Sequence, residues 1–367
     1  MRLGISAEFV RPGLVGGAEQ ALHYLVDGLI EELADGHRIV IIGDEFPVEQ
    51  RSGVTFLDAP HRHSVRFVQE SMTLRALSSE LDVCYFPNYF TPPVRSVCPV
   101  ITTIPDLKYR HYPENFSRKK RLWQRWAHGS TLRRADAVTV YSEFVRTDVL
   151  DHYGDRHAGK VNVLRLPVSW DRFGHDEAKR PARPYVLSVA SHYKHKNLAT
   201  LVRAFGAVYR EHPDLELVLV GQLGGNLLGV SQADDIPAVV EEAGLGDAVR
   251  TTGYVGVQQL GTLYRNAELF VFPSVFEGFG LPPVEALGFG LPVVTTRCTS
   301  LPEVTRGLAR YVDDPCDQEE LAHTILEALR SSNRPAPDEI ADLRAHYSPR
   351  AVARDFLAIA RGLTRSA

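Results

Sequence analysis

Short apolar runs alternate with segments of helical periodicity from one end of the chain to the other. This alternation predicts parallel α/β architecture, because parallel strands need crossover connections and these are usually helices. In the first half we expect strands in RLGIS, HRIVIIG, VTFLD, DVCYFP, PVITTIP, AVTVYS and VNVLRLP. In the second half we expect them in YVLSVAS, LELVLVG, VRTTGYV, LFVFPS, PVVTT and LARYVD.

Several segments between the strands carry apolar residues at helical spacing, which predicts helices over Ala18–Leu33, Val65–Ser79 and Arg118–Arg134. A last helix is predicted over Pro349–Thr364. Its apolar positions fall on one face, namely Val352, Phe356, Ile359, Ala360 and Leu363.

A chain of 367 residues is too long for one ordinary hydrophobic core, so we expect two domains. Around Trp170–Pro184 the sequence becomes polar and proline-bearing, which is typical of a linker. We predict Rossmann-like domains over 1–172 and 185–347, a linker over 173–184 and a terminal segment over 348–367. Because ligands gather beyond the carboxyl ends of parallel strands, a ligand cleft is expected between the two sheets.

Composition narrows the class of protein. Apolar residues make up 44% and charged residues 23%, as in soluble globular proteins, and the net charge of −4 argues against nucleic acid as the main partner. Four cysteines lack metal-ligand spacing and are read as reduced thiols: Cys84, Cys98, Cys298 and Cys316. No signal peptide or membrane-spanning run is visible, so we expect a cytoplasmic enzyme.

The most informative stretch runs from Leu269 to Val304. A strand, LFVFPS, leads into the loop EGFGLPP, and a helix is expected to start at or near Pro282 and Pro283 and to stop near Gly288 and Gly290. The backbone N–H groups at its start lie at the positive end of the helix dipole and could bind a phosphate; they belong to Phe279, Gly280 and Leu281.

Two carboxylates bracket this loop: Glu277 on the loop and Glu285, expected in the first helical turn. An anion site flanked by hydroxyl-binding carboxylates suits a nucleotide sugar. The alternative is an ordinary strand–loop–helix unit with a capping glutamate.

The Glu-x7-Glu spacing, with FGLPPVEAL and GLPVVTT, resembles the donor-site signature of the retaining glycosyltransferases of family 4, in the GT-B superfamily. The resemblance implies that Glu277 holds hydroxyls of the donor sugar and Glu285 those of the ribose. The N–H groups near Gly280 and Leu281 would stabilise the departing diphosphate. It also implies that the last helix crosses back to the first domain.

The basic loop before the next expected helix, KHKNL, resembles the family's RKNL and places the phosphate-binding lysine at Lys196. Many members carry an arginine five positions earlier, where this chain has Ser191. Either His192, Lys194 or His195 substitutes for it, or the diphosphate is held less tightly.

Two further segments are similar to the family's donor site. The loop containing Gly16 and Gly17 resembles its GGAE-type loop, which faces the donor phosphate and the acceptor. The segment TTGYVGVQQLGTLYRNAELF resembles the strand end that lines the nucleobase pocket, which makes Tyr254 and Val255 candidate base contacts. Taken alone, both segments are also compatible with ordinary turns at strand ends.

One segment departs from the family. VITTIPDLKYRHYP resembles a stretch in which a histidine contacts the transferred sugar, but Pro105 stands there, with Asp106 retained. His111 is one candidate for replacing the lost contact. A rearranged sugar pocket and an inactive or partner-dependent homologue both fit this departure.

The helix Arg118–Arg134 carries seven Lys/Arg and two tryptophans. A basic helix with aromatics can dock on an anionic bilayer, so peripheral membrane contact is one interpretation. Alternatively, Leu122, Trp123 and Trp126 face the domain core and the arginines are simply solvated.

The resemblance implies a retaining hexosyltransferase that transfers a sugar from a nucleoside diphosphate to an acceptor hydroxyl without cofactor, metal or general base. Asp234–Asp235 and Asp313–Asp314 are read as a helix start and a strand end. The sequence is similar to bacterial enzymes of cell-surface polysaccharide synthesis, which often use mannose-type donors. The rivals are a GT-B sugar-nucleotide epimerase and a degenerate, non-enzymatic partner subunit. A phosphorylase-like enzyme and an NAD enzyme are disfavoured by chain length and by the missing G-x-G-x-x-G.

Overall fold

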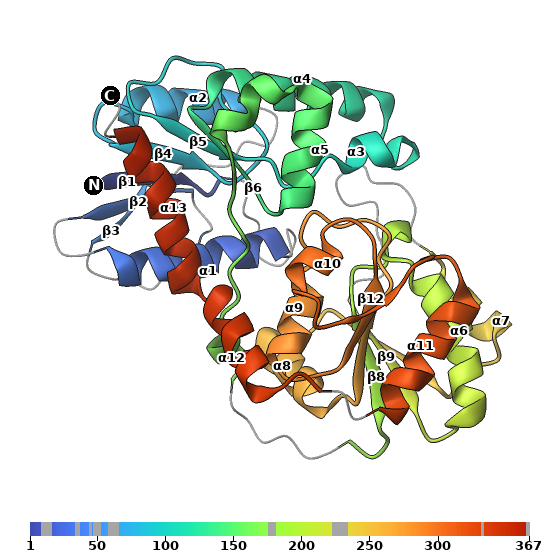
Figure 1. Ribbon diagram of the computed structural model, residues 1–367. Coiled ribbons are helices and arrows are strands. Elements are labelled where there is room, and N and C mark those ends of the chain that lie inside the picture. The colour runs from blue at the N-terminus through green and yellow to red at the C-terminus, as the bar shows by residue number, and fades with distance from the viewer. Residues whose placement is uncertain are drawn as a thin grey trace. The chain divides into compact units, whose positions relative to one another are not determined.

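The computed structural model describes residues 1–8, 17–33, 37–43, 46, 53–57, 66–174, 181–221, 234–331 and 334–364 (Figure 1). The chain divides into two compact units. The first comprises Met1–His111, Arg118–Val168 and His346–Ala367, and the second comprises Tyr112–Ser117 and Ser169–Ala345.

The first unit is built on a seven-stranded parallel sheet in the order β3-β2-β1-β4-β5-β6-β7. Its strands follow the predicted apolar runs: β1 Arg2–Ser6, β2 Arg38–Ile42, β3 Val54–Leu57, β4 Val83–Phe86, β5 Val100–Thr103, β6 Ala137–Val140 and β7 Val161–Val163. The order reverses between β1 and β4, which is where ligands bind in open sheets of this kind.

Helices cover both faces of this sheet: α1 Gly17–Glu32, α2 Arg66–Leu77, α3 Lys108–His111, α4 Arg118–Arg134, α5 Glu143–Tyr153 and α13 Pro349–Thr364. Figure 1 shows α2, α4 and α5 on one side of the sheet and α1 with α13 on the other. Short 3₁₀ turns, η1 Pro113–Asn115 and η2 Asp155–Lys160, complete the connections.

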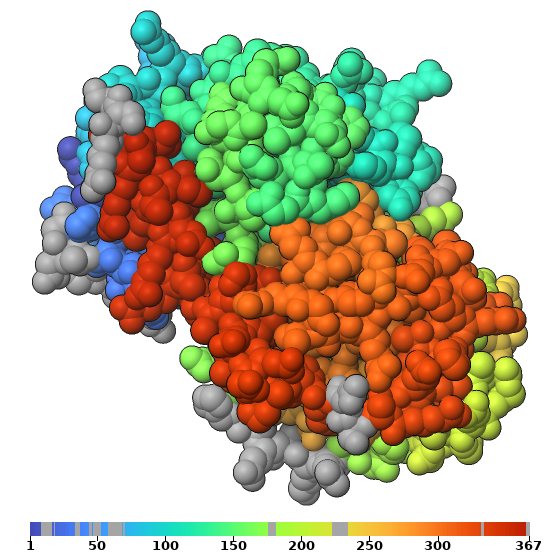
Figure 2. Space-filling model, in the orientation of Figure 1, coloured from blue at the N-terminus to red at the C-terminus, as the bar shows by residue number. Residues whose placement is uncertain are grey.

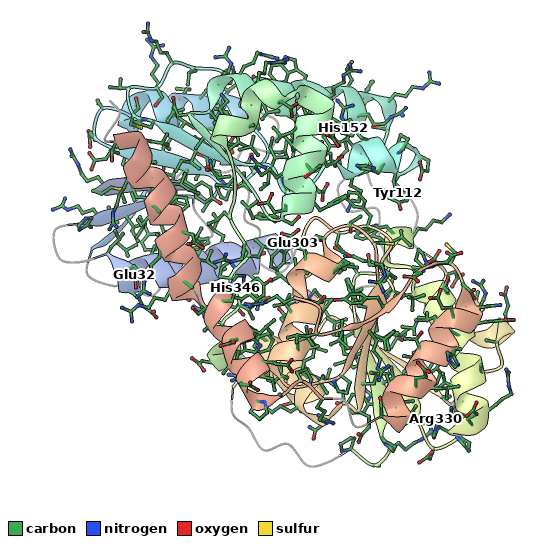
Figure 3. All side chains as sticks on the ribbon, in the orientation of Figure 1. Glu32, Tyr112, His152, Glu303, Arg330 and His346 are labelled. Carbon is green, nitrogen blue, oxygen red and sulfur yellow. The ribbon has the colours of Figure 1, made fainter. Side chains whose placement is uncertain are left out.

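The last helix packs on the first. The predicted apolar face of α13 enters the core of the first unit, where Val352, Phe356 and Ala360 are fully buried and Ile359 and Leu363 partly buried. Figure 2 shows this red helix seated against the blue N-terminal residues. At its start, Arg350 and Arg354 pair with Glu32 of α1 and lower the pKa of that carboxyl (Figure 3).

The second unit contains a six-stranded parallel sheet in the order β10-β9-β8-β11-β12-β13. Its strands are β8 Tyr185–Val189, β9 Glu216–Val220, β10 Val249–Gly253, β11 Leu269–Phe272, β12 Val293–Thr296 and β13 Arg310–Val312. Both sheets are thus parallel, as the apolar runs predicted, and each unit is Rossmann-like. Here the order reverses between β8 and β11.

The helical elements of the second unit are α6 Leu198–Glu211, α7 Ile236–Glu242, α8 Val257–Asn266, α9 Leu281–Gly288, α10 Leu301–Val304, α11 Gln318–Arg330 and α12 Pro337–His346, with 3₁₀ turns η3 Trp170–Phe173 and η4 Lys194–Lys196. Phe173, the first residue of the expected linker, is buried against Tyr264 and Phe289 and belongs to this core. Linker residues 175–180 lie outside the described residues.

Candidate functional site

The centre of the candidate site is an ion pair between two loops at the carboxyl ends of β8 and β11. Lys196, in η4, places Nζ 2.5 Å from Oε1 of Glu277, which follows β11. Both side chains are mostly shielded, with 17% and 12% of their surfaces exposed. The phosphate-binding lysine and the sugar-binding glutamate predicted from separate segments are therefore direct neighbours.

The Glu277 side chain is held by a third residue. Ser274 donates its hydroxyl to Glu277 Oε1 at 2.6 Å and also lies 3.0 Å from the carbonyl oxygen of His195, so it joins the two loops. The backbone N–H of Val275 donates to the same His195 carbonyl at 2.8 Å. Ser274 is completely buried and was not predicted as a site residue, although it is the last residue of the predicted strand LFVFPS.

Backbone contacts hold the loop that follows Glu277. The backbone N–H of Glu277 donates to Thr299 Oγ1 at 3.0 Å. Ser300 Oγ donates to the carbonyl oxygens of Glu277 and Phe279 at 3.0 and 2.8 Å. Thr299 adopts a left-handed φ of 53°. These hydroxyls come from the segment after β12, and no motif in the sequence linked them to the loop.

The loop enters α9 through Gly280, whose φ is 96°. This left-handed φ favours glycine, and a β-carbon there would approach Leu301 Cδ2 to 2.8 Å, so that side chain would have to shift. The helix begins at Leu281, next to the predicted start. Since Pro282 and Pro283 have no N–H, Gly280 and Leu281 carry the donors at this helix end.

The second carboxylate of the signature, Glu285, has a different environment. We expected it in the first helical turn, but α9 starts at Leu281 and Glu285 is its fifth residue, so this placement was wrong. Its side chain is buried, and Oε2 accepts a 2.8 Å hydrogen bond from the Tyr264 hydroxyl. Trp170 Nε1 donates to the Glu285 carbonyl at 3.3 Å.

Burial raises the pKa of Glu285 to about 7, an effect that the Tyr264 hydrogen bond partly offsets. Burial therefore favours the protonated form of Glu285 more than in an exposed glutamate, which matters for a group expected to accept hydrogen bonds from hydroxyls. Tyr264 lies in the quoted LYRNA segment, but nothing in that pattern indicated its contact with Glu285.

The other residues predicted on the donor side differ in how deeply they are buried. Ser191 is exposed, whereas His195 is buried and stacks on Tyr193 with ring centroids 5.8 Å apart. Tyr254 is 70% exposed beyond the end of β10, and Val255 beside it is buried. Phe279 and Leu281 are buried as well, so they can offer a ligand little beyond backbone groups.

In the first unit, Gly17 is the exposed first residue of α1, and Gly16 lies outside the described residues. Asp106 accepts a 2.8 Å hydrogen bond from the N–H of Lys108, the first residue of α3. His111 Nε2 lies 2.9 Å from both carboxylate oxygens of Asp148, a residue that the sequence did not single out. His152, which lies on α5 with Asp148, places its Nδ1 3.1 Å from Asp148 Oδ1 (Figure 3).

The basic helix α4 has the bounds predicted for it and exposes its largest apolar side chains. Leu122, Trp123 and Trp126 are 70%, 40% and 44% exposed. The tryptophan rings lie over the buried Phe90, with centroids 5.5 and 5.8 Å away. We call these three residues the tryptophan patch; the interpretation that they face the core was wrong.

The part of the chain that the structure describes has neither a metal-binding cluster nor a membrane-spanning helix. It contains no group of three or more His, Cys, Asp or Glu side chains able to hold a metal ion. Asp235 caps α7, and Asp313, just after β13, pairs with Arg297 at 2.6 Å. None of its helices is long and apolar enough to cross a membrane.

Comparison with known families matches almost the whole chain. The family described as "Glycosyl transferases group 1" matches residues 172–344. "Glycosyltransferase Family 4" matches residues 15–172.

Curated relatives include the O-antigen chain mannosyltransferase B of Escherichia coli, 28% identical over 270 residues that cover 70% of this chain and 68% of the relative. The O-antigen chain mannosyltransferase RfbU of Salmonella typhimurium is 26% identical over 58% of this chain and 56% of its own length.

Solved structures show the same fold. Sucrose-phosphate synthase from Thermosynechococcus elongatus superimposes with a TM-score of 0.78 at 19% identity and full coverage of both chains. Anabaena HepE, in complex with UDP and glucose, gives 0.69 at 17% identity, covering 100% of this chain and 99% of HepE.

Proposed function

The chain belongs to the group 1 glycosyltransferases of family 4, which have the GT-B fold, and we propose that it is a retaining mannosyltransferase of bacterial surface-polysaccharide synthesis. The donor is a nucleoside-diphosphate sugar, and the acceptor is a hydroxyl of a carbohydrate or lipid-linked glycan. The mannosyltransferase names of the curated relatives support the donor class.

The Lys196–Glu277 pair carries this proposal, because it joins a cation for the diphosphate to a carboxylate for the sugar in one place. Lys196 and the N–H groups of Gly280 and Leu281 stabilise the negative charge that develops on the leaving diphosphate. Glu277 orients the sugar through its hydroxyls, and Glu285 accepts those of the ribose.

The configuration at the anomeric carbon C1 is retained if the acceptor hydroxyl attacks C1 on the same face from which the diphosphate leaves. The C1–phosphate bond breaks, the bond from the acceptor oxygen to C1 forms, and the acceptor proton passes to the departing phosphate oxygen. This sequence needs no protein nucleophile or general base. It also uses no metal ion or organic cofactor, since fixed positive groups face the diphosphate.

Calorimetric titration with UDP, GDP, ADP and dTDP, followed by the matching sugar nucleotides, tests the proposal. We expect the chain to bind one of the four nucleoside diphosphates and to hydrolyse the matching sugar nucleotide slowly. When a glycan acceptor is added, we expect an α-linked product. No binding to any of the four favours the degenerate partner subunit. Conversion of the sugar nucleotide without need of an acceptor favours the epimerase.

The proposed location is the cytoplasmic face of the membrane, reached through α4. The tryptophan patch lies on a helix whose exposed basic residues would meet anionic headgroups; these are Arg118, Lys119, Arg125, Arg133 and Arg134. Such contact would bring the enzyme to a lipid-linked acceptor.

A further inference from the structure

Three residues other than glycine adopt a left-handed backbone within the described part of the chain: Asn197, Thr299 and Arg306, with φ of 58°, 53° and 54°. Such a φ is uncommon for residues with a side chain, and it is a strong outlier for threonine, which branches at the β-carbon. Strained residues persist where the surrounding structure holds them, often at functional sites. Two of these three adjoin the Lys196–Glu277 pair.

Asn197 directly follows Lys196 and joins its loop to two others. Its Nδ2 donates to the carbonyl oxygen of Pro273, after β11, at 3.2 Å and to that of Pro315, after β13, at 2.5 Å. Its Oδ1 accepts a 2.7 Å hydrogen bond from the Thr200 hydroxyl, on α6. The left-handed backbone turns the chain from η4 into α6 at this residue, so the direction of Lys196 depends on it.

Thr299 holds the other half of the pair. Its Oγ1 accepts the backbone N–H of Glu277 at 3.0 Å, and the next residue, Ser300, donates its hydroxyl to the Glu277 carbonyl at 3.0 Å. The peptide groups on both sides of Glu277 are therefore fixed by one short segment after β12. Glycine would adopt the φ of Thr299 without strain but has no hydroxyl. The contact to Glu277, and not the turn itself, accounts for a threonine here.

Arg306 has the same backbone conformation in a different setting. It follows α10, its side chain is exposed, and its N–H donates to the Glu303 carbonyl at 3.1 Å within the same turn. Arg306 is therefore a reference for the left-handed conformation by itself.

We propose that Asn197 and Thr299 are positioning residues: Asn197 sets the direction of Lys196 toward the donor diphosphate, and Thr299 sets the direction of Glu277 toward the donor sugar. Each acts through its charged neighbour. The roles of that lysine and glutamate rest on the proposed transferase function, whereas the order that the two positioning residues impose on the ion pair exists in the free protein.

Turnover and nucleotide affinity separate the two roles. Thr299→Gly should lower kcat about tenfold, the effect of one lost hydrogen bond, and leave nucleoside diphosphate affinity within about twofold, since the lysine is undisturbed. Thr299→Ser keeps the hydroxyl and should retain wild-type kcat. Asn197→Gly keeps the left-handed backbone but loses the amide, so it should lower both kcat and nucleotide affinity about tenfold.

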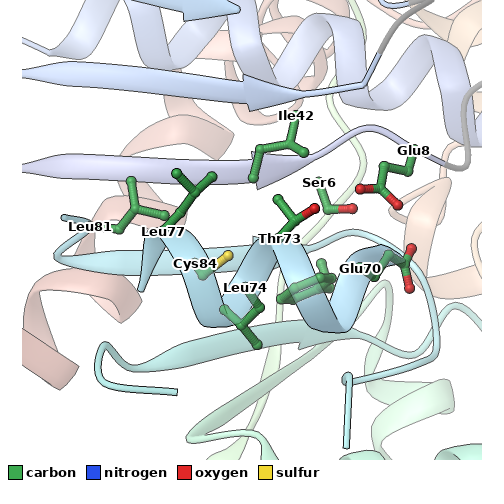
Figure 4. A pocket seen from close by; sticks show the side chains of 10 residues that line it. Ser6, Glu8, Ile42, Glu70, Thr73, Leu74, Leu77, Leu81 and Cys84 are labelled. Atoms are coloured by element: carbon green, nitrogen blue, oxygen red, sulfur yellow. The ribbon is translucent and has the colours of Figure 1, made fainter. Parts of the chain in front are cut away.

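Two variants are matched controls for these changes. Arg306→Gly makes the same change of backbone strain at an exposed turn and should keep wild-type kcat. Thr73→Val removes a threonine hydroxyl from α2 in the first unit, where Thr73 lines a cavity of about 10 Å³ with room for one water molecule (Figure 4). It should also behave as wild type.

The ion pair itself gives a readout that does not need activity. A double-mutant cycle with Lys196→Met and Glu277→Gln, followed by urea unfolding, measures the coupling of the two charges in the free protein. We expect a coupling of about tenfold in the unfolding constant for the wild-type background, and of about threefold or less in the Thr299→Gly and Asn197→Gly backgrounds. A residue that only stabilised the fold would shift the midpoint and leave this coupling unchanged.

Unchanged coupling in both backgrounds would overturn the proposal. Wild-type kcat in Thr299→Gly would also overturn it, and so would a loss of kcat in Arg306→Gly as large as that in Thr299→Gly. Failure of the transferase function appears differently, as a wild-type chain that neither binds a nucleoside diphosphate nor turns over its sugar nucleotide. In that case the coupling still tests the positioning of the ion pair.

Discussion

Lys196 Nζ and Glu277 Oε1 lie 2.5 Å apart although the residues are separated by 81 positions in the chain. The pair forms because β8 and β11 are neighbours in the sheet, so the loops that follow them meet at its carboxyl edge. Shielding from water makes each charge costly without the other. A bound donor can replace both contacts, with its diphosphate on Lys196 and its hydroxyls on Glu277.

Replacement of Glu277 by alanine should abolish turnover while nucleoside diphosphate binding stays within about tenfold of wild type, or roughly 1.4 kcal/mol. The lysine keeps its charge for the phosphates, but the sugar loses the group that orients it. Steady-state kinetics and calorimetry measure the two effects. Glu242→Gln, on the exposed end of α7, is the control. Retained turnover would refute the role given to Glu277.

Ser274→Ala should lower kcat about tenfold or more, because a buried hydrogen bond to a charged group is lost. The loss should be much smaller in a Glu277→Gln background, since the serine acts by orienting that carboxylate. A double-mutant cycle on kcat measures the coupling. Additive effects would show that Ser274 acts on the His195 loop alone.

The strands were predictable because parallel strands are buried on both faces and read as apolar runs. Lys196 and Glu277 were predictable one by one, since each lies in a recognisable local segment. Their partners were not, because Ser274 joins two loops and Tyr264 reaches Glu285 from another helix. The environment of Glu285 also escaped prediction. Acidic residues are usually exposed, yet every residue of α9 but Pro282 is buried.

The tryptophan patch predicts binding to vesicles that contain anionic phosphatidylglycerol and not to vesicles of phosphatidylcholine alone. The double variant Trp123→Ser, Trp126→Ser should sediment with anionic vesicles several-fold less than wild type, as should the wild type at high salt. Met72→Ser removes a similarly exposed apolar side chain from α2 and is the control. Absence of wild-type sedimentation at low salt would rule out the proposed contact.

Gly28 predicts a stability effect at the α1–α13 contact. A β-carbon there would come within 2.1 Å of the Pro349 carbonyl oxygen, which is backbone and cannot turn away. Gly28→Ala should therefore destabilise the first unit by about 1–3 kcal/mol, as overpacking does. At Gly129 of α4 the nearest atom is 3.4 Å away on the flexible Arg133 side chain, so Gly129→Ala should be neutral or stabilising by up to about 1 kcal/mol. Urea unfolding of both variants compares them.

Glu285 should make nucleotide affinity depend on pH near neutrality. A carboxylate can accept both ribose hydroxyls, whereas its protonated form has lost part of that capacity, so affinity should rise as the pH passes the Glu285 pKa of about 7. Tyr264→Phe removes the hydrogen bond that lowers this pKa and should move the rise to higher pH. Calorimetry between about pH 6 and about pH 8 measures the nucleotide affinity at each pH. Glu285→Gln cannot ionise at this position, so any pH dependence that remains in it comes from other groups, such as the nucleotide phosphates.

In the protein without nucleotide, the free energy of unfolding should fall as the pH rises, whereas nucleotide affinity should rise. Because burial raises the Glu285 pKa from 4.5 to about 7, the folded state favours the protonated form more than the unfolded state does. This contribution to the free energy of unfolding is complete below pH 4.5 and is lost as the pH rises through 7, a change of about 3 kcal/mol. Glu285→Gln should remove that slope. A wild-type slope that persists in Glu285→Gln would assign the titration to another group.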